Sequence, residues 1–147
     1  MIMRVDATCF WTLVIGSWLT LVPMSVGLAA DTFMPGPPTI VSISPDGVQR
    51  ATIILDSYSY SPNHLVVESG KPVELTLTSR TTFIPHNFVM KELLAGLWIE
   101  QDVGAGKTII AKLVPTHPGF FPFFCDKRLW PIPSHRDKGM EGLLEVR

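Results

Sequence analysis

Cysteine is scarce in this sequence of 147 residues, in which Cys9 and Cys125 are the only two. A strong charge of either sign is also missing, because 12 lysines and arginines against 13 aspartates and glutamates leave a net charge of −1. This balance excludes a generally basic nucleic-acid-binding protein. The length allows one small domain with a single modest core.

The N-terminal part has no charged residue at all over residues 7–30. Arg4 ahead of this apolar run and the small residues that end it at Ala30 are typical of an export signal. We therefore expect residues 1–30 to be a signal peptide and the remainder to be periplasmic or otherwise exported. The alternative is an uncleaved anchor over residues 7–30, because the run is long enough to cross about 30 Å of hydrocarbon. A membrane contact is expected only in that second case.

Removal of the signal would leave Cys125 as the only cysteine, so no disulfide could form within the exported part. A lone thiol in an oxidising compartment needs to be buried or occupied. Structural zinc sites usually take more cysteines or C-x-x-C pairs, and the sequence has neither. The G-A-G-K-T segment at residues 104–108 lacks the first glycine of a phosphate-binding loop and precedes an alternating apolar run. It is interpreted as a turn into a strand.

Long segments with helical periodicity are missing too, and only residues 92–98 could hold a helical turn. Short apolar runs follow one another instead, separated by glycine, proline and aspartate. Val73, Leu75 and Leu77 alternate with polar residues, as in a strand with one buried face. This pattern predicts an all-β sandwich or small barrel over residues 39–147, after a Pro/Gly-rich tether at 31–38. The expected strands cover residues 39–43, 51–55, 72–78, 88–90, 107–114, 119–125 and 142–146.

Four side chains in this part of the chain are soft or borderline metal ligands. Taken singly, each has an ordinary explanation: Cys125 as a small buried apolar residue, His86 as a hydrogen-bonded core residue, His135 as a loop residue and Met140 as a core residue. Taken together, a thiolate, two imidazoles and a thioether are the set that selects copper in a trigonal site with a weak axial sulfur. The sequence therefore predicts one copper ion per chain.

Four segments, in the same order, resemble the motifs of the cupredoxins, the blue-copper protein family. The resemblance implies a Greek-key β-sandwich, and it makes Asn87 a residue that ties the first-histidine loop to the cysteine loop. The copper ligands that it implies are His86, Cys125 and His135, with Met140 in the axial position. The segments are S-P-N-H-L-V-V-E-S-G-K-P-V-E-L-T-L-T-S (61–79), H-N-F (86–88), P-G-F-F-P-F-F-C (118–125) and H-R-D-K-G-M-E-G-L-L-E-V (135–146).

The sequence departs from the family pattern between the cysteine and the second histidine. Family members usually place two to four residues there, whereas this chain has nine, and Asp126 stands where a serine or threonine is common. The extra length is compatible with ligation, since doubling a loop adds only about 0.6 kcal/mol of closure entropy. It makes His135 the least secure of the ligands, with His64 and His117 as possible substitutes.

A site of this kind leaves no open position for a substrate, so we expect electron transfer and no enzymatic activity. There is also no H-x-H pair of the kind that binds further coppers. Two alternatives stay open: a copper carrier or buffer, and a metal-free cupredoxin-like domain for protein contacts. The expected partner is a redox protein, a cytochrome or another copper protein, docking near the basic and aromatic loop at residues 126–138.

Overall fold

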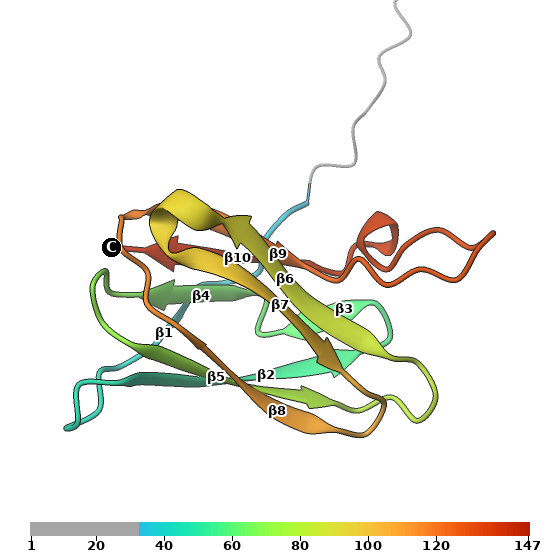
Figure 1. Cartoon of the computed structure of the whole chain (residues 1–147), viewed down its shortest axis with the longest axis horizontal. Helices are drawn as coiled ribbons and strands as arrows, with labels where there is room; N and C mark the ends of the chain where they lie inside the picture. Colours follow the sequence, from blue (N-terminus) through green and yellow to red (C-terminus); the bar gives the residue numbers. More distant parts are fainter. Residues whose placement is uncertain (1–32) are drawn as a thin grey trace, which may run out of the picture. The chain divides into compact units, whose positions relative to one another are not determined.

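The computed structural model describes residues 33–147, so the predicted signal peptide and the first two residues of the tether lie outside the described residues. Ten strands in this part form two facing sheets (Figure 1). Two short helical turns accompany them, and neither has the length and apolar character that a membrane span requires. In spatial order, the larger sheet holds β1 (Thr39–Ile40), β4 (His64–Val67), β10 (Glu141–Val146), β9 (Gly119–Phe124), β6 (His86–Glu92) and β7 (Leu97–Val103). The smaller sheet holds β3 (Ser59–Ser61), β2 (Gln49–Asp56), β5 (Val73–Ser79) and β8 (Thr108–Leu113).

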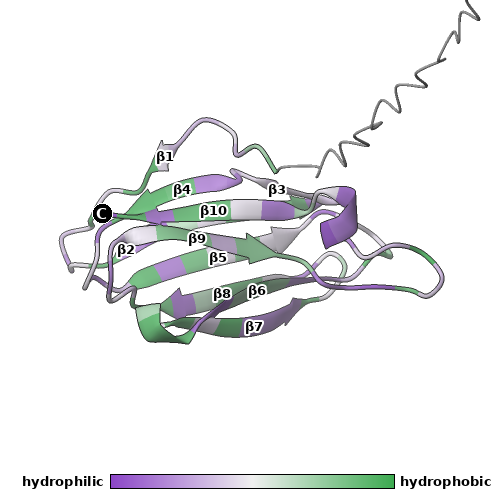
Figure 2. Ribbon diagram, turned by 90° about the horizontal axis from the view of Figure 1, so that it is seen from above, coloured by the Kyte–Doolittle hydropathy of each residue, from purple (hydrophilic) through white to green (hydrophobic). Residues whose placement is uncertain are grey.

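The core lies between the sheets because apolar and polar residues alternate along the strands (Figure 2). In β5, Val73, Leu75 and Leu77 are fully buried, and the polar residues Glu74 and Thr76 between them are only partly covered. Each such side chain contributes roughly 1.5–3 kcal/mol when it is buried. Phe123 of β9 points the same way, into the core, as the sequence pattern of that strand predicts.

The topology confirms the predicted β-sandwich. The chain passes from one sheet to the other six times: between β1 and β2, β3 and β4, β4 and β5, β5 and β6, β7 and β8, and β8 and β9. These crossings pair β2 with β5 and β4 with β10 in parallel, while β9 runs antiparallel to both of its neighbours, β10 and β6. The antiparallel run matters for the site, because the start of β6, the end of β9 and the start of β10 meet at one end of the sheet.

The main difference from the sequence prediction is β7. The helical turn expected over residues 92–98 is limited to Leu93–Ala95 and ends at Gly96, which has a positive φ of 71°. The chain then continues as β7, at the edge of the sheet beside β6. Two of the three outward positions of this strand hold Glu100 and Asp102, but Trp98 is also outward and Gln101 interrupts the inward row, so the alternation is weak in the sequence.

The described part of the predicted tether contacts the sandwich. The backbone N–H of Gly36 donates to Asn63 Oδ1 at 2.9 Å, and the Gly36 carbonyl lies 3.2 Å from His64 Nδ1. These bonds attach the segment to the start of β4.

Candidate metal centre

Three strand ends place the predicted ligands side by side. His86 is the first residue of β6, Cys125 directly follows β9, and Met140 directly precedes β10. Since Phe124 pairs with both Val89 of β6 and Glu141 of β10, these strand ends lie at the same end of the sheet.

Donor atoms of His86, Cys125 and His135 all lie within 4.8 Å of one another. His135 Nδ1 is 3.3 Å from Cys125 Sγ, and the two imidazole centroids are 5.1 Å apart. The structure therefore brings together the three residues that were predicted as equatorial ligands. The spacing suits one ion held between the three side chains.

His86 is fully buried, yet neither of its ring nitrogens has a hydrogen-bond partner within residues 33–147. A buried polar group without a partner is costly, on the order of 1–3 kcal/mol. The pKa of His86 is lowered to about 4, first by burial and then by the charge of the neighbouring His135, against a smaller opposite effect of Asp56. The imidazole is therefore neutral near pH 7 and able to donate a nitrogen lone pair to a metal.

Cys125 is also fully buried. Burial raises the pKa of its thiol, while backbone N–H groups of Asn87 and Lys127 act in the opposite direction. The Asn87 N–H donates to Cys125 Sγ over 3.4 Å. Because the thiol is protonated near neutral pH, metal binding would release its proton.

Asn87 makes the connection between the two ligand loops that the sequence predicts. Its Nδ2 donates to Asp126 Oδ1 at 2.7 Å, and the Asp126 backbone N–H donates back to Asn87 Oδ1 at 3.1 Å. The carboxylate thus occupies the position of the usual serine or threonine and accepts a hydrogen bond there. Both bonds fix the segment around Cys125 relative to the start of β6.

The long loop is closed at its base by the backbone. The His135 N–H donates to the Lys127 carbonyl at 2.9 Å, so the chain returns to its starting point after seven residues. The Met140 N–H then donates to the His135 carbonyl at 2.9 Å, and the Cys125 N–H donates to the Met140 carbonyl at 3.1 Å. Gly139, at φ 89°, makes the turn that carries the chain back to Met140, which is fully buried. The axial role of Met140 stays a prediction.

The two possible substitutes for His135 lie outside the metal-binding group. His64 is held by Gly36 and by Glu145, whose Oε2 is 3.2 Å from His64 Nε2. His117 is exposed, and its Nδ1 is 2.9 Å from Thr116 Oγ1. The structure therefore favours His135 over both of them.

The profile of the cupredoxin-like domain matches residues 28–134. The chain belongs to the cupredoxin-like family. The match covers His86 and Cys125 and stops just before His135. No curated protein sequence matches the chain significantly.

Solved structures share the fold of this cupredoxin at low identity. The metal-binding domain of the Cu(I)-exporting P-type ATPase CopA of Streptococcus pneumoniae D39, with Cu(I), has a TM-score of 0.59 and 20% identity, over 76% of this chain and 96% of that one. Reduced auracyanin of Roseiflexus castenholzii has a TM-score of 0.54 and 18% identity, over 67% of this chain and 96% of that one. A multicopper oxidase gives 0.54 and 17%, over 73% of this chain and 45% of that one. Such identities show a common fold.

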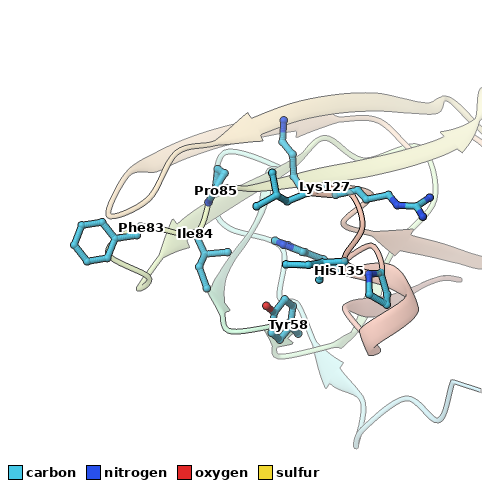
Figure 3. Close-up of a pocket in the computed structure, with 10 residues that line it drawn as sticks. Tyr58, Phe83, Ile84, Pro85, Lys127 and His135 are labelled. Carbon is cyan, nitrogen blue, oxygen red and sulfur yellow. The ribbon is translucent and has the colours of Figure 1, made fainter.

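A groove of about 400 Å³ opens beside His135 on the surface of the cupredoxin (Figure 3). Its walls are the segment Phe83–Pro85 on one side and Leu129, Ile132 and Pro133 of the long loop on another. Tyr58 completes the lining. Its ring meets the His135 ring edge to face, with centroids 5.0 Å apart and planes at 84°. The sequence offers no sign of this contact, because Tyr58 lies in a turn far from any ligand motif.

Much of the positive charge on the 126–138 loop is already paired. Lys127 Nζ lies 2.6 Å from Asp102 Oδ1, and Arg136 pairs with Glu141 while its guanidinium covers the Phe124 ring at 4.1 Å. Arg128 and Lys138 have no carboxylate partner within residues 33–147. Of these two, Arg128 lines the groove and Lys138 lies over the Tyr58 ring, so the loop presents fewer free cations than its sequence suggests.

Proposed function

We propose that this cupredoxin is an exported electron carrier with one copper ion, held by His86, Cys125, His135 and Met140. One observation carries the proposal: a thiol and two imidazoles converge within 4.8 Å, and both nitrogens of the buried His86 lack a partner in the described chain. An ion at this point would satisfy one of those nitrogens. Export is proposed from the character of residues 1–30.

The residues around the donors suit electron transfer. When bound there, copper supplies a one-electron couple between Cu(II) and Cu(I). Phe88 and Phe123, which pack against each other with centroids 5.0 Å apart, exclude water from the inner side of the site. The Tyr60 hydroxyl donates to the Asn87 carbonyl at 2.5 Å and holds the backbone next to His86. A site held so firmly changes little between oxidation states.

We further propose that the partner is a redox protein, a cytochrome or a copper protein, with an acidic face. The long loop exposes Leu129 at 74% and Trp130 at 81%, close to the unpaired Arg128. An apolar surface with free cations at its edge favours an acidic partner with an apolar centre. The groove beside His135 would give the partner access to the edge of the site.

A copper carrier or buffer is the second candidate. His135 is only partly buried and borders the groove, so a metal held there would be open to exchange. The solved domain of the Cu(I)-exporting ATPase adds a related fold with bound Cu(I). A metal-free interaction domain has less support, because the predicted donors keep a mutual arrangement that fits an ion.

The test is the absorption and EPR spectrum of the copper-loaded residues 31–147, with the reduction potential. We expect strong thiolate-to-copper absorption that bleaches reversibly on reduction. Preferential Cu(I) capture without a stable coloured form would instead support the carrier.

Replacing the thiol tests the ligand assignment. We expect Cys125→Ser to remove the thiolate absorption, because the hydroxyl is a much poorer ligand for copper, and to leave the β-sheet circular dichroism unchanged. His117→Ala is a suitable control, since His117 lies outside the donor group. Retention of the absorption in Cys125→Ser would refute the assignment.

A further inference from the structure

Tyr58 has a backbone conformation that its side chain disfavours. It is the second residue of the two-residue turn Ser57–Tyr58, which joins β2 and β3 where Asp56 pairs with Ser59. Its φ is +60°, and every other positive φ within residues 33–147 belongs to a glycine. The turn alone would therefore favour glycine at this position. A bulky residue in this region points to a role for its side chain elsewhere.

The Tyr58 ring contacts both the second histidine and a lysine. One contact is the edge-to-face packing on His135, in which Figure 3 shows the two rings next to each other. The other is Lys138 Nζ, 4.1 Å from the centroid of the Tyr58 ring. Such a cation over an aromatic face is attracted by the ring electrons. Two residues of the segment 135–138 therefore contact the Tyr58 ring.

His135 needs this support more than His86 does. It follows the long loop, it is only partly buried, and within residues 33–147 Cys125 Sγ is the one hydrogen-bond partner of its ring. Backbone bonds position its main chain but leave rotation about the side-chain torsions free. Packing must then contribute to the ring orientation, and the two rings that pack on His135 are His86 and Tyr58.

We propose that Tyr58 is a positioning residue that orients the His135 imidazole toward Cys125, with Lys138 holding the tyrosine ring in place. Its effect on metal binding rests on the proposed function, whereas its effect on His135 can be measured without metal. In this proposal, the free-energy cost of the positive φ at Tyr58 is offset by the ordering of the His135 ring.

The decisive variant is Tyr58→Gly in the otherwise intact chain, compared with Tyr58→Phe. Tyr58→Gly removes the ring and places glycine at the positive φ, so the metal-free variant should fold and melt close to the wild type. Its His135 imidazole signals in NMR should broaden or average, and copper affinity should fall on the order of tenfold. Tyr58→Phe should match the wild type in both, because the ring is kept.

Two more variants separate the ring from the turn. Ser57→Gly loosens the same turn but keeps the ring, and should leave the His135 signals unchanged. Lys138→Gln removes the cation without touching the turn, and should broaden the His135 signals to a smaller degree; it also provides the test if Tyr58→Gly fails to fold.

The outcomes distinguish this inference from the proposed function. Unchanged His135 signals in Tyr58→Gly, or in Lys138→Gln if the glycine variant is unfolded, would overturn the inference. Broadened His135 signals in Tyr58→Phe would also overturn the inference, since the ordering of His135 would then depend on the tyrosine hydroxyl and not on its ring. Broadened signals in Tyr58→Gly combined with no copper binding by the wild type would support the positioning role and reject the copper function.

Discussion

His86 shows most clearly how a single side chain can be in conflict with its surroundings. A buried imidazole normally donates through one nitrogen and accepts at the other, and here both are without a partner in the described residues. No described residue offers either nitrogen a hydrogen bond. A bound ion would satisfy one of the two nitrogens, so the same feature that destabilises the metal-free protein favours metal binding.

The titration of His86 leads to a pH dependence of stability. Its pKa is about 4 in the folded protein and the ordinary 6.5 in the unfolded chain, so the unfolded chain takes up the proton first as the pH falls. The free energy of unfolding should therefore be highest above pH 6.5 and decrease towards pH 4, by on the order of 3 kcal/mol from this residue. Urea unfolding of the metal-free protein at several pH values measures it.

A His86→Gln variant is the control for this effect, because glutamine is polar and does not titrate. Acidic groups also lose stabilising contacts at low pH, and they do so in both proteins. The difference between the two pH profiles isolates His86. Parallel profiles between pH 6.5 and 4 would contradict the assigned shift.

At the scale of elements, the loop between β9 and β10 divides into a base and an excursion. The base is the hydrogen bond from the His135 N–H to the Lys127 carbonyl, and the excursion is Arg128–Ser134. Within the excursion, exposed apolar residues predominate, and the backbone bond from Ile132 N–H to the Leu129 carbonyl closes a turn. None of the predicted donors lies in the excursion.

We expect that Arg128–Ser134 can be replaced by two glycines without loss of copper binding. In that variant Lys127 and His135 become the first and last residues of a β-turn, which has the same hydrogen bond. The copper absorption and the affinity should stay within a few-fold of the wild type. Titration with Cu(II), followed by absorption, measures both.

A matched control replaces the same segment with seven residues of glycine and serine. This loop has the original length but a larger conformational freedom, so its copper affinity should be the lower of the two. Loss of copper binding in the two-glycine variant alone would show that the excursion itself supports the site.

The elements also show where sequence reasoning succeeds and where it does not. The alternation of Val73, Leu75 and Leu77 is a local property of a strand with one buried face, and β5 forms as predicted. The edge strand β7 was missed because Glu100 and Asp102 lie on its solvent side and only its pairing with β6 makes it a strand. The local sequence pattern predicts a strand where one face of the strand is strongly buried. It fails where the strand forms only because it is hydrogen-bonded to a segment distant in the chain.

At the scale of the whole molecule, the metal centre and the exposed loop share one end of the sandwich. Exposed aromatic residues occur elsewhere too, such as Trp98 on β7, which pairs with Lys91 towards the far end of β6 from His86. Trp130 on the long loop and Trp98 on β7 therefore provide a comparison between a surface near the site and one away from it.

Electron exchange with the physiological partner should depend on the loop. We expect Trp130→Ala combined with Arg128→Ala to lower the exchange rate several-fold and to weaken its dependence on salt, since one apolar contact and one free cation are lost. Stopped-flow kinetics at several ionic strengths measures both quantities. Trp98→Ala with Lys91→Ala is the matched control and should behave as the wild type; an equal effect of both pairs would reject the loop as the docking surface.

The sequence by itself determined the strands with strong alternation, the kinds of donor atoms and their order along the chain, because these depend on residue type and neighbours only. The tertiary structure decided the rest. The burial of His86 without a hydrogen-bond partner among residues 33–147 and the packing of Tyr58 on His135 both depend on segments that are distant in the chain. Such contacts follow from how two sheets and their loops fill space, which no local pattern contains.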